Sequence, residues 1–200
     1  MSLFKERFGN DDVEVVISDL LIATADSSDA LLDDSISEVL RRLREQLRMD
    51  VVFVSEFVNG QRVFRFVDAG GAALPFGPGD SSPLEQSYCK LVVDQRLPEL
   101  VPDVAKLPRS IPLPPTDVKV GAHLSTPIVM KDGRAFGTLC CYSAAPNEAL
   151  QHRDLSALRH CAQLVARKLE VVREHQQRAL QDTEIMAPDW ALEPIEPTRR

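Results

Sequence analysis

Apolar residues recur at helical spacing near the start of the chain. In residues 11–25 and again in residues 32–47 they fall three or four positions apart, which predicts two amphipathic helices. Asp and Ser residues between the two segments interrupt the pattern and offer N-cap side chains to the second helix. The sequence therefore predicts an N-terminal helical extension, residues 1–26, followed by a helix that borders the main domain.

A longer helical stripe occupies residues 151–181. Its apolar positions alternate in steps of three and four, the spacing of a coiled-coil seam. This helix and the helix over residues 32–47 are each longer than one small sheet requires, which predicts a homodimer joined through both. Residues 182–200 contain three prolines and no periodicity, so we expect a flexible tail there. The stripe consists of Leu155, Leu158, Ala162, Val165, Leu169 and Val172.

Between these helices the hydrophobic period becomes that of strands. Runs of β-branched and aromatic residues flank Asn59-Gly60, and similar runs flank Asp132-Gly133. Both dipeptides are typical of tight turns, so each pair of runs predicts an antiparallel hairpin. A short strand is expected near residues 99–101. Meandering hairpins do not build a parallel sheet, and the sequence therefore predicts an α+β fold with a central antiparallel sheet flanked by helices.

Two irregular segments accompany these strands. Residues 69–80 are rich in glycine and residues 102–117 in proline, so both are predicted to be long loops, which are often functional. Between them, Ser82-Pro83 and Glu85 have the form of a capping box with proline at the first helical position. This pattern predicts a helix that begins at Pro83 and continues to about Asp94.

Composition narrows the class of protein. The chain has 200 residues, of which 44% are hydrophobic, and 30 acidic residues against 23 basic ones give a net charge of -7. Binding to nucleic acid or to an anionic membrane needs clustered Lys and Arg, so both are disfavoured. The four cysteines include no CxxC pair, which indicates free thiols and no zinc site. Without an apolar segment long enough for a membrane span or a signal peptide, we expect a cytoplasmic protein.

Several segments resemble the successive pieces of a GAF domain, in the order in which that family has them. The resemblance lies in the strand over residues 50–57, the helix over 84–89, Leu100-Val101-Pro102-Asp103, and the hairpin over 120–141. It implies a GAF-like, PAS-related fold over residues 27–181. The nearest form is the N-terminal GAF sensor module of bacterial cyclic-di-GMP phosphodiesterases that carry an EAL domain.

The resemblance implies a sensory function. GAF domains are sensors of small ligands or cofactors, and their pocket lies between one face of the sheet and the loops above it. The loops over residues 69–82 and 102–117 are long enough to cover that face. No EAL domain follows in this sequence, so we expect a bacterial regulator that is not an enzyme. We expect it to form a homodimer and to signal through its terminal helices to a partner protein.

Strand alternation and the resemblance together indicate which residues face the pocket. Residues two apart in a strand share a face, as Phe53 and Ser55 do. By comparison with bilin-binding GAF domains, this face carries the ligand, and Tyr88 and Cys89 on the predicted helix would line the same pocket. The candidate ligand-binding residues are Phe53, Ser55, Tyr88, Cys89, His123, Ser125, Thr138, Cys140 and Tyr142.

The ligand's identity stays open, but two cofactors are disfavoured. GAF domains that bind haem or a covalent bilin place a cysteine or histidine just before the fourth main strand, and residues 103–121 contain neither. No catalytic or metal-ligating residue is assigned. For His123, a hydrogen bond to a ligand and a partner within the protein are both compatible with a buried imidazole.

Two other functions are compatible with the sequence. The first is a ligand-free structural dimerisation module, in which the same aromatic residues form an ordinary core. The second is a thiol-dependent enzyme similar to the free methionine sulfoxide reductases, with Cys89 near one of that family's thiol positions. Thr116-Asp117 stands where that family has its catalytic Cys-Asp, which disfavours this chemistry.

Overall fold

Both predicted hairpins form in the computed structural model, which describes residues 29–185. Asn59 and Gly60 have positive φ angles of 50° and 75°, and Gly133 has a φ of 79°, as the predicted turns require. The first hairpin is therefore confirmed at Asn59-Gly60 and the second at Asp132-Gly133. Their strands are β1 (Val51–Val58), β2 (Gln61–Asp68), β5 (Ala122–Val129) and β6 (Ala135–Ser143).

The two hairpins lie next to each other in one six-stranded sheet of order β3-β2-β1-β6-β5-β4. The edge strands are short: β3 (Ser81–Pro83) pairs with β2, and β4 (Leu100–Val101) pairs with β5. Every strand pair within the described residues is antiparallel. The predicted α+β fold with a central antiparallel sheet is confirmed.

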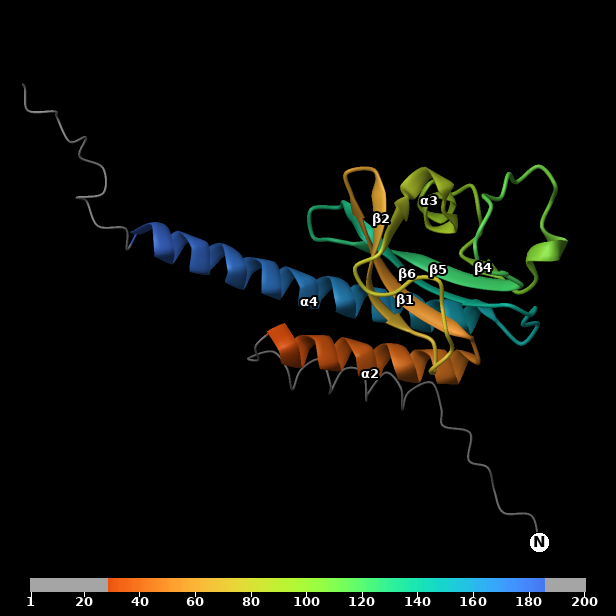
Figure 1. Cartoon of the computed structure of the whole chain (residues 1–200), viewed down its shortest axis with the longest axis horizontal. Helices are drawn as coiled ribbons and strands as arrows, with labels where there is room; N and C mark the ends of the chain where they lie inside the picture. The colour runs from red at the N-terminus through yellow and green to blue at the C-terminus, as the bar shows by residue number, and fades with distance from the viewer. Residues whose placement is uncertain (1–28, 186–200) are drawn as a thin grey trace, which may run out of the picture.

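Two long helices, α2 (Asp29–Leu47) and α4 (His152–Ile185), cover one face of this sheet, and they lie side by side in Figure 1. Their apolar stripes point at the strands and form the larger core of the protein. Residues of both stripes are almost completely buried there, including Ile36, Val39, Leu40, Leu43, Leu155, Leu158, Ala162 and Val165.

The burial of these stripes changes the prediction of how a dimer would form. Val165 is 1% exposed, and Leu169 is half-buried against the same core. The seam of α4 is thus occupied by the sheet and α2 of its own chain. Leu155, Leu158, Ala162 and Val165 are therefore not available for an intermolecular seam, which the sequence alone does not show. That the two helices join a homodimer stays a prediction.

The helix after the first loop begins later than the capping box predicts. Ser82 pairs with Arg62 in the β2–β3 ladder, so the backbone of the proposed cap belongs to the sheet. A short 3-10 turn, η1 (Leu84–Gln86), follows, and its start has no side-chain cap. The helix proper is α3 (Tyr88–Val93), capped by Ser87, whose hydroxyl accepts a hydrogen bond from the Lys90 N–H at 3.1 Å.

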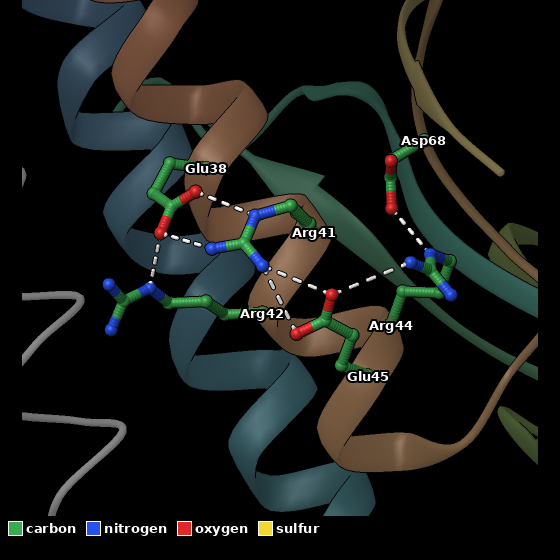
Figure 2. A network of polar contacts seen from close by, with 6 residues as sticks. All are labelled: Glu38, Arg41, Arg42, Arg44, Glu45 and Asp68. Atoms are coloured by element: carbon green, nitrogen blue, oxygen red, sulfur yellow. Dashed lines mark hydrogen bonds and ion pairs between the residues drawn. The ribbon is translucent and has the colours of Figure 1, made fainter. Parts of the chain in front are cut away.

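Ion pairs on the outer surface of α2 connect this helix to the end of β2 (Figure 2). Glu38 pairs with Arg41 and Arg42, and these contacts lower the pKa of Glu38 to about 2. Further along, the Arg44 Nε donates to Asp68 at 2.5 Å. A Cβ at Gly70, where φ is 59°, would lie 2.8 Å from the Arg44 guanidinium. Arg44 thus packs against the base of the loop over residues 69–80.

The structure tests only part of the predicted domain boundaries, because it describes residues 29–185. The predicted helix over residues 11–25 lies outside the described residues, as does most of the predicted tail. The helix α4 continues to Ile185, four residues past its predicted end. No helix in the described part of the chain has the length and apolar character needed to span a membrane.

Candidate functional site

The face of the sheet opposite α2 and α4 carries a cavity of about 570 Å³. Strand residues form its floor, α3 forms one wall, and both long loops contribute to its cover. Phe76 comes from the first loop, and Thr116 and Asp117 come from the second. The two loops thus cover this face of the sheet, as their lengths in the sequence predicted. Its volume is within the range of ordinary small-molecule sites.

Aromatic rings form one side of the cavity. Phe53 and Phe64 meet edge to face with centroids 5.1 Å apart, and Phe64 stacks on Phe76 at 4.2 Å. Tyr88 lies tilted against His123, with ring centroids 5.3 Å apart. Side chains of this kind supply a large apolar surface with few degrees of freedom, which suits a planar ligand.

Arg62 is the basic residue of the cavity wall. Its guanidinium lies 4.6 Å from the centroid of the Phe64 ring. Its Nη2 donates to the Ser82 hydroxyl at 2.9 Å, and its Nη1 lies 3.8 Å from the Cys89 sulfur. Within the described residues, no carboxylate forms an ion pair with Arg62. The cavity therefore contains a cation that no acid among residues 29–185 neutralises.

Two thiols and an imidazole lie beside this arginine. The Cys140 sulfur lies 3.2 Å from the His123 Nε2. A hydrogen bond from Cys140, together with the charge of Arg62, lowers the pKa of Cys89, whereas burial raises the pKa of Cys140. Burial lowers the pKa of His123 to about 4, and the charge of Arg62 contributes to this shift. The imidazole is therefore neutral at physiological pH.

Four buried polar atoms in this region have no hydrogen-bond partner among the described residues. They are the Arg62 Nε, the His123 Nδ1, the Ser125 hydroxyl and the Tyr142 hydroxyl. Leaving such a group unpaired costs about 1–3 kcal/mol, so most buried polar atoms in proteins are paired. Three of the four belong to residues that line the cavity. The polar side of the cavity is thus suited to a ligand with matching groups.

The structure brings all nine candidate residues to one face of the sheet, but in two layers. The cavity is lined by Phe53, Tyr88, Cys89, His123, Cys140 and Tyr142. The other three lie beneath that surface. Ser55 and Thr138 are fully buried and join their hydroxyls at 3.0 Å, and Ser125 pairs with Cys140 in the β5–β6 ladder. These three support the lining residues and do not line the cavity themselves.

Sequence reasoning missed Arg62, Phe64 and Phe76. The signal for Arg62 was present, because a two-residue turn at Asn59-Gly60 places it opposite Phe57, and opposite residues of an antiparallel pair share a face. A β-bulge next to Ser55 then shifts the register and places Phe66 on the helix-covered face. Phe76 lies in a loop, where no sequence period indicates a direction.

The geometry does not favour a metal centre. Among residues 29–185, no three histidine, cysteine or acidic side chains are arranged to hold an ion. All four cysteines are buried. The polar groups of the cavity instead suit an organic molecule that combines apolar surface with a few hydrogen-bonding groups.

The sequence matches a known protein family over most of its length. Residues 29–170 match the family model described as GAF domain. No curated protein matches the sequence.

Solved structures share the fold at low sequence identity. The GAF domain of an Acinetobacter phosphoenolpyruvate-protein phosphotransferase is 14% identical with a TM-score of 0.64, covering 94% of this chain and 100% of that one. The free methionine-R-sulfoxide reductase of Neisseria meningitidis, solved with its substrate, is 16% identical with a TM-score of 0.64, covering 88% and 98%. A phycocyanobilin-bound GAF domain from a cyanobacterial phytochrome is 17% identical with a TM-score of 0.61, covering 86% and 98%.

Proposed function

This chain belongs to the GAF domain family, and we propose that it is a sensor module that binds a small molecule in the cavity over its sheet. The observation that carries the proposal is the group of unpaired buried polar atoms beside an aromatic wall. Two structural neighbours support the proposal because each was solved with a bound small molecule. The cyanobacterial GAF domain holds phycocyanobilin, and the Neisseria meningitidis reductase holds its substrate.

Native mass spectrometry of freshly purified protein tests this proposal. The expected result is a species heavier than the chain, whose extra mass is lost on denaturation and can be identified in the released fraction. The released compound should rebind wild-type protein and bind Tyr142→Phe about tenfold more weakly, because that variant keeps the ring and loses the unpaired hydroxyl. Arg65→Gln is the matched control, since Arg65 pairs with Glu56 away from the cavity.

A protein that carries no small molecule and accepts none from a filtered cell extract would contradict the proposal. The better account would then be the structural dimerisation module, in which the aromatic side chains act as a core. A haem or covalent bilin is not part of the proposal, because residues 103–121 contain neither Cys nor His.

We also propose a regulatory role without catalysis, in a bacterial cytoplasmic setting. Cys89 lines the cavity, but the second loop offers Thr116 and Asp117 there and no second thiol. Reductase chemistry of the free methionine sulfoxide type needs resolving cysteines in these loops. Incubation with free methionine sulfoxide and a dithiol reductant should therefore give no turnover, and sustained turnover would contradict this part of the proposal.

The output is proposed to pass through α4 to a partner, with the protein acting as a homodimer. Val172 is the last α4 side chain that packs on the core among those that the structure describes, and the helix continues past the sheet to Ile185 (Figure 1). Val171 on this helix is 37% exposed, one of two large exposed hydrophobic side chains in the described region. Sedimentation at micromolar concentration should show a dimer, and a monomer would contradict the proposal.

A further inference from the structure

We infer that the ligand of this cavity carries a carboxylate that binds against Arg62 and a planar apolar body that packs on the aromatic wall. The inference rests on the proposed function and adds the charge class of the ligand. The evidence for a carboxylate is the set of hydrogen-bond partners around Arg62, which includes no acid among the described residues.

No carboxylate among the described residues holds Arg62 in place. Ser82 accepts from Nη2, the Phe64 ring lies below the guanidinium, and the Nε is buried with no partner. Arg62 is partly buried, and a guanidinium partly removed from water is stabilised by a negative partner and by acceptors for its N–H groups. A carboxylate meets both needs, since it accepts two N–H groups in the plane of the guanidinium.

The acids in the described part of the chain do not fill this role. Asp80 and Asp117 line the same cavity, but neither pairs with Arg62 within the described residues. One Asp80 oxygen already accepts from the Gly77 N–H at 2.8 Å. The rival partner is Cys89, whose sulfur lies 3.8 Å from Nη1 and whose thiolate would neutralise Arg62 without a ligand.

The remaining polar atoms support an acceptor-rich ligand. Tyr142 presents an unpaired buried hydroxyl to the same cavity, and it can donate to a carboxylate oxygen. His123 is neutral and supplies no second positive charge. The aromatic wall of Phe53, Phe64 and Phe76 then faces the rest of the ligand.

Matched acid and amide fragments test the inference, because each pair has the same shape and differs in charge. The probes are benzoate with benzamide, 2-naphthoate with 2-naphthamide, and indole-3-acetate with indole-3-acetamide, measured by ligand-observed NMR on the full chain at pH 7.5. For wild-type protein, at least one acid should bind about tenfold more tightly than its amide. Arg62→Gln should abolish this preference, and Arg62→Lys should retain part of it.

Arg65→Gln is the control for charge removal on the same strand, and it should keep the preference. Equal binding of acids and amides to wild-type protein would overturn the inference and favour the Cys89 thiolate as the partner of Arg62. A preference that survives in Arg62→Gln would overturn it too, as would a lack of binding by every acid. A neutral molecule found by native mass spectrometry would reject this inference and leave the proposed function standing.

Discussion

The Nε2 of His123 lies 3.2 Å from the sulfur of Cys140, and the two residues are diagonal neighbours on β5 and β6. The tautomer of His123 decides which of the two atoms donates in this contact. The other ring nitrogen, Nδ1, is buried and has no partner among the described residues.

The ionisation of His123 provides a first prediction. Its pKa is lowered from 6.5 to about 4 by burial, with a contribution from Arg62. Ring resonances of His123, assigned with the His123→Gln variant, should show no titration between pH 8 and about pH 5. Titration of this ring near pH 6.5 would contradict the buried, neutral imidazole.

The same shift makes stability depend on pH in a definite direction. Above pH 6.5 neither the folded nor the unfolded chain binds a proton at this site. Between pH 6.5 and about pH 4 only the unfolded chain binds one, so the free energy of unfolding decreases as the pH falls, by on the order of 3 kcal/mol. Urea denaturation should show a smaller decrease for His123→Gln over this window. An equal decrease in both proteins would reject His123 as its source.

Thiol reactivity should distinguish the two faces of the sheet. Cys89 lines the cavity, whereas Cys141 lies in the helix-covered core, where burial raises its pKa. Brief treatment with iodoacetamide followed by peptide mass spectrometry should find Cys89 modified first, and the four cysteines should react alike in denaturant. Earlier modification of Cys141 or Cys161 would contradict access through the cavity.

The buried pair of Ser55 and Thr138 should couple the two central strands. Their hydroxyl oxygens lie 3.0 Å apart, and both side chains are fully buried. Ser55→Ala and Thr138→Val should each destabilise the protein by about 1–3 kcal/mol, because each leaves a hydroxyl without its partner. The double variant should lose about 1 kcal/mol less than the sum. Additive losses would show that the hydrogen bond makes no net contribution.

Gly137 should tolerate no side chain, for a steric reason. An added Cβ would lie 1.8 Å from the backbone oxygen of Ser55 on the neighbouring strand. Gly137→Ala should therefore destabilise the protein by about 3 kcal/mol in denaturant unfolding. Gly133→Ala is the matched control, since a Cβ there meets nothing within 4 Å and only the φ of 79° is strained. It should cost about 1–2 kcal/mol, and a larger loss than for Gly137→Ala would contradict this account.

Glutamate substitutions on α4 should separate folding from association. Val165→Glu would place a charge in the core of the chain and should destabilise the fold by about 3–5 kcal/mol. Val171→Glu lies on the exposed side of the same helix and should leave the unfolding midpoint within experimental error. If α4 joins the proposed dimer, Val171→Glu should produce a folded monomer. A dimer that persists in Val171→Glu would place the interface elsewhere.

The sequence was sufficient for the two hairpins, because turn residues and alternation are local properties. Asn59-Gly60 fixed the register of the first hairpin, and the stripes of both long helices identified their buried sides. The capping box failed because the backbone of Ser82 pairs with β2 in a contact that depends on residues twenty positions earlier. A cap can be read from sequence only where no strand competes for the same backbone.

The site was predictable to the extent that it follows strand alternation. As strand alternation predicted, the cavity is lined by Phe53, His123, Cys140 and Tyr142. The same alternation places Ser55 on this face of the sheet, and it does not show that Ser55 is buried beneath the cavity lining. That distinction depends on where α3 and the loops rest. The loop position of Phe76 and the lack of an acid near Arg62 are tertiary properties, which the sequence alone does not specify.

The most direct test of the central claim is an experimental crystal structure of the protein purified without refolding. Our account predicts electron density for a small molecule in the cavity, within hydrogen-bond distance of the Arg62 Nε and the Tyr142 hydroxyl. A cavity closed by the loop over residues 69–80, with these atoms paired to groups of the chain, would contradict it.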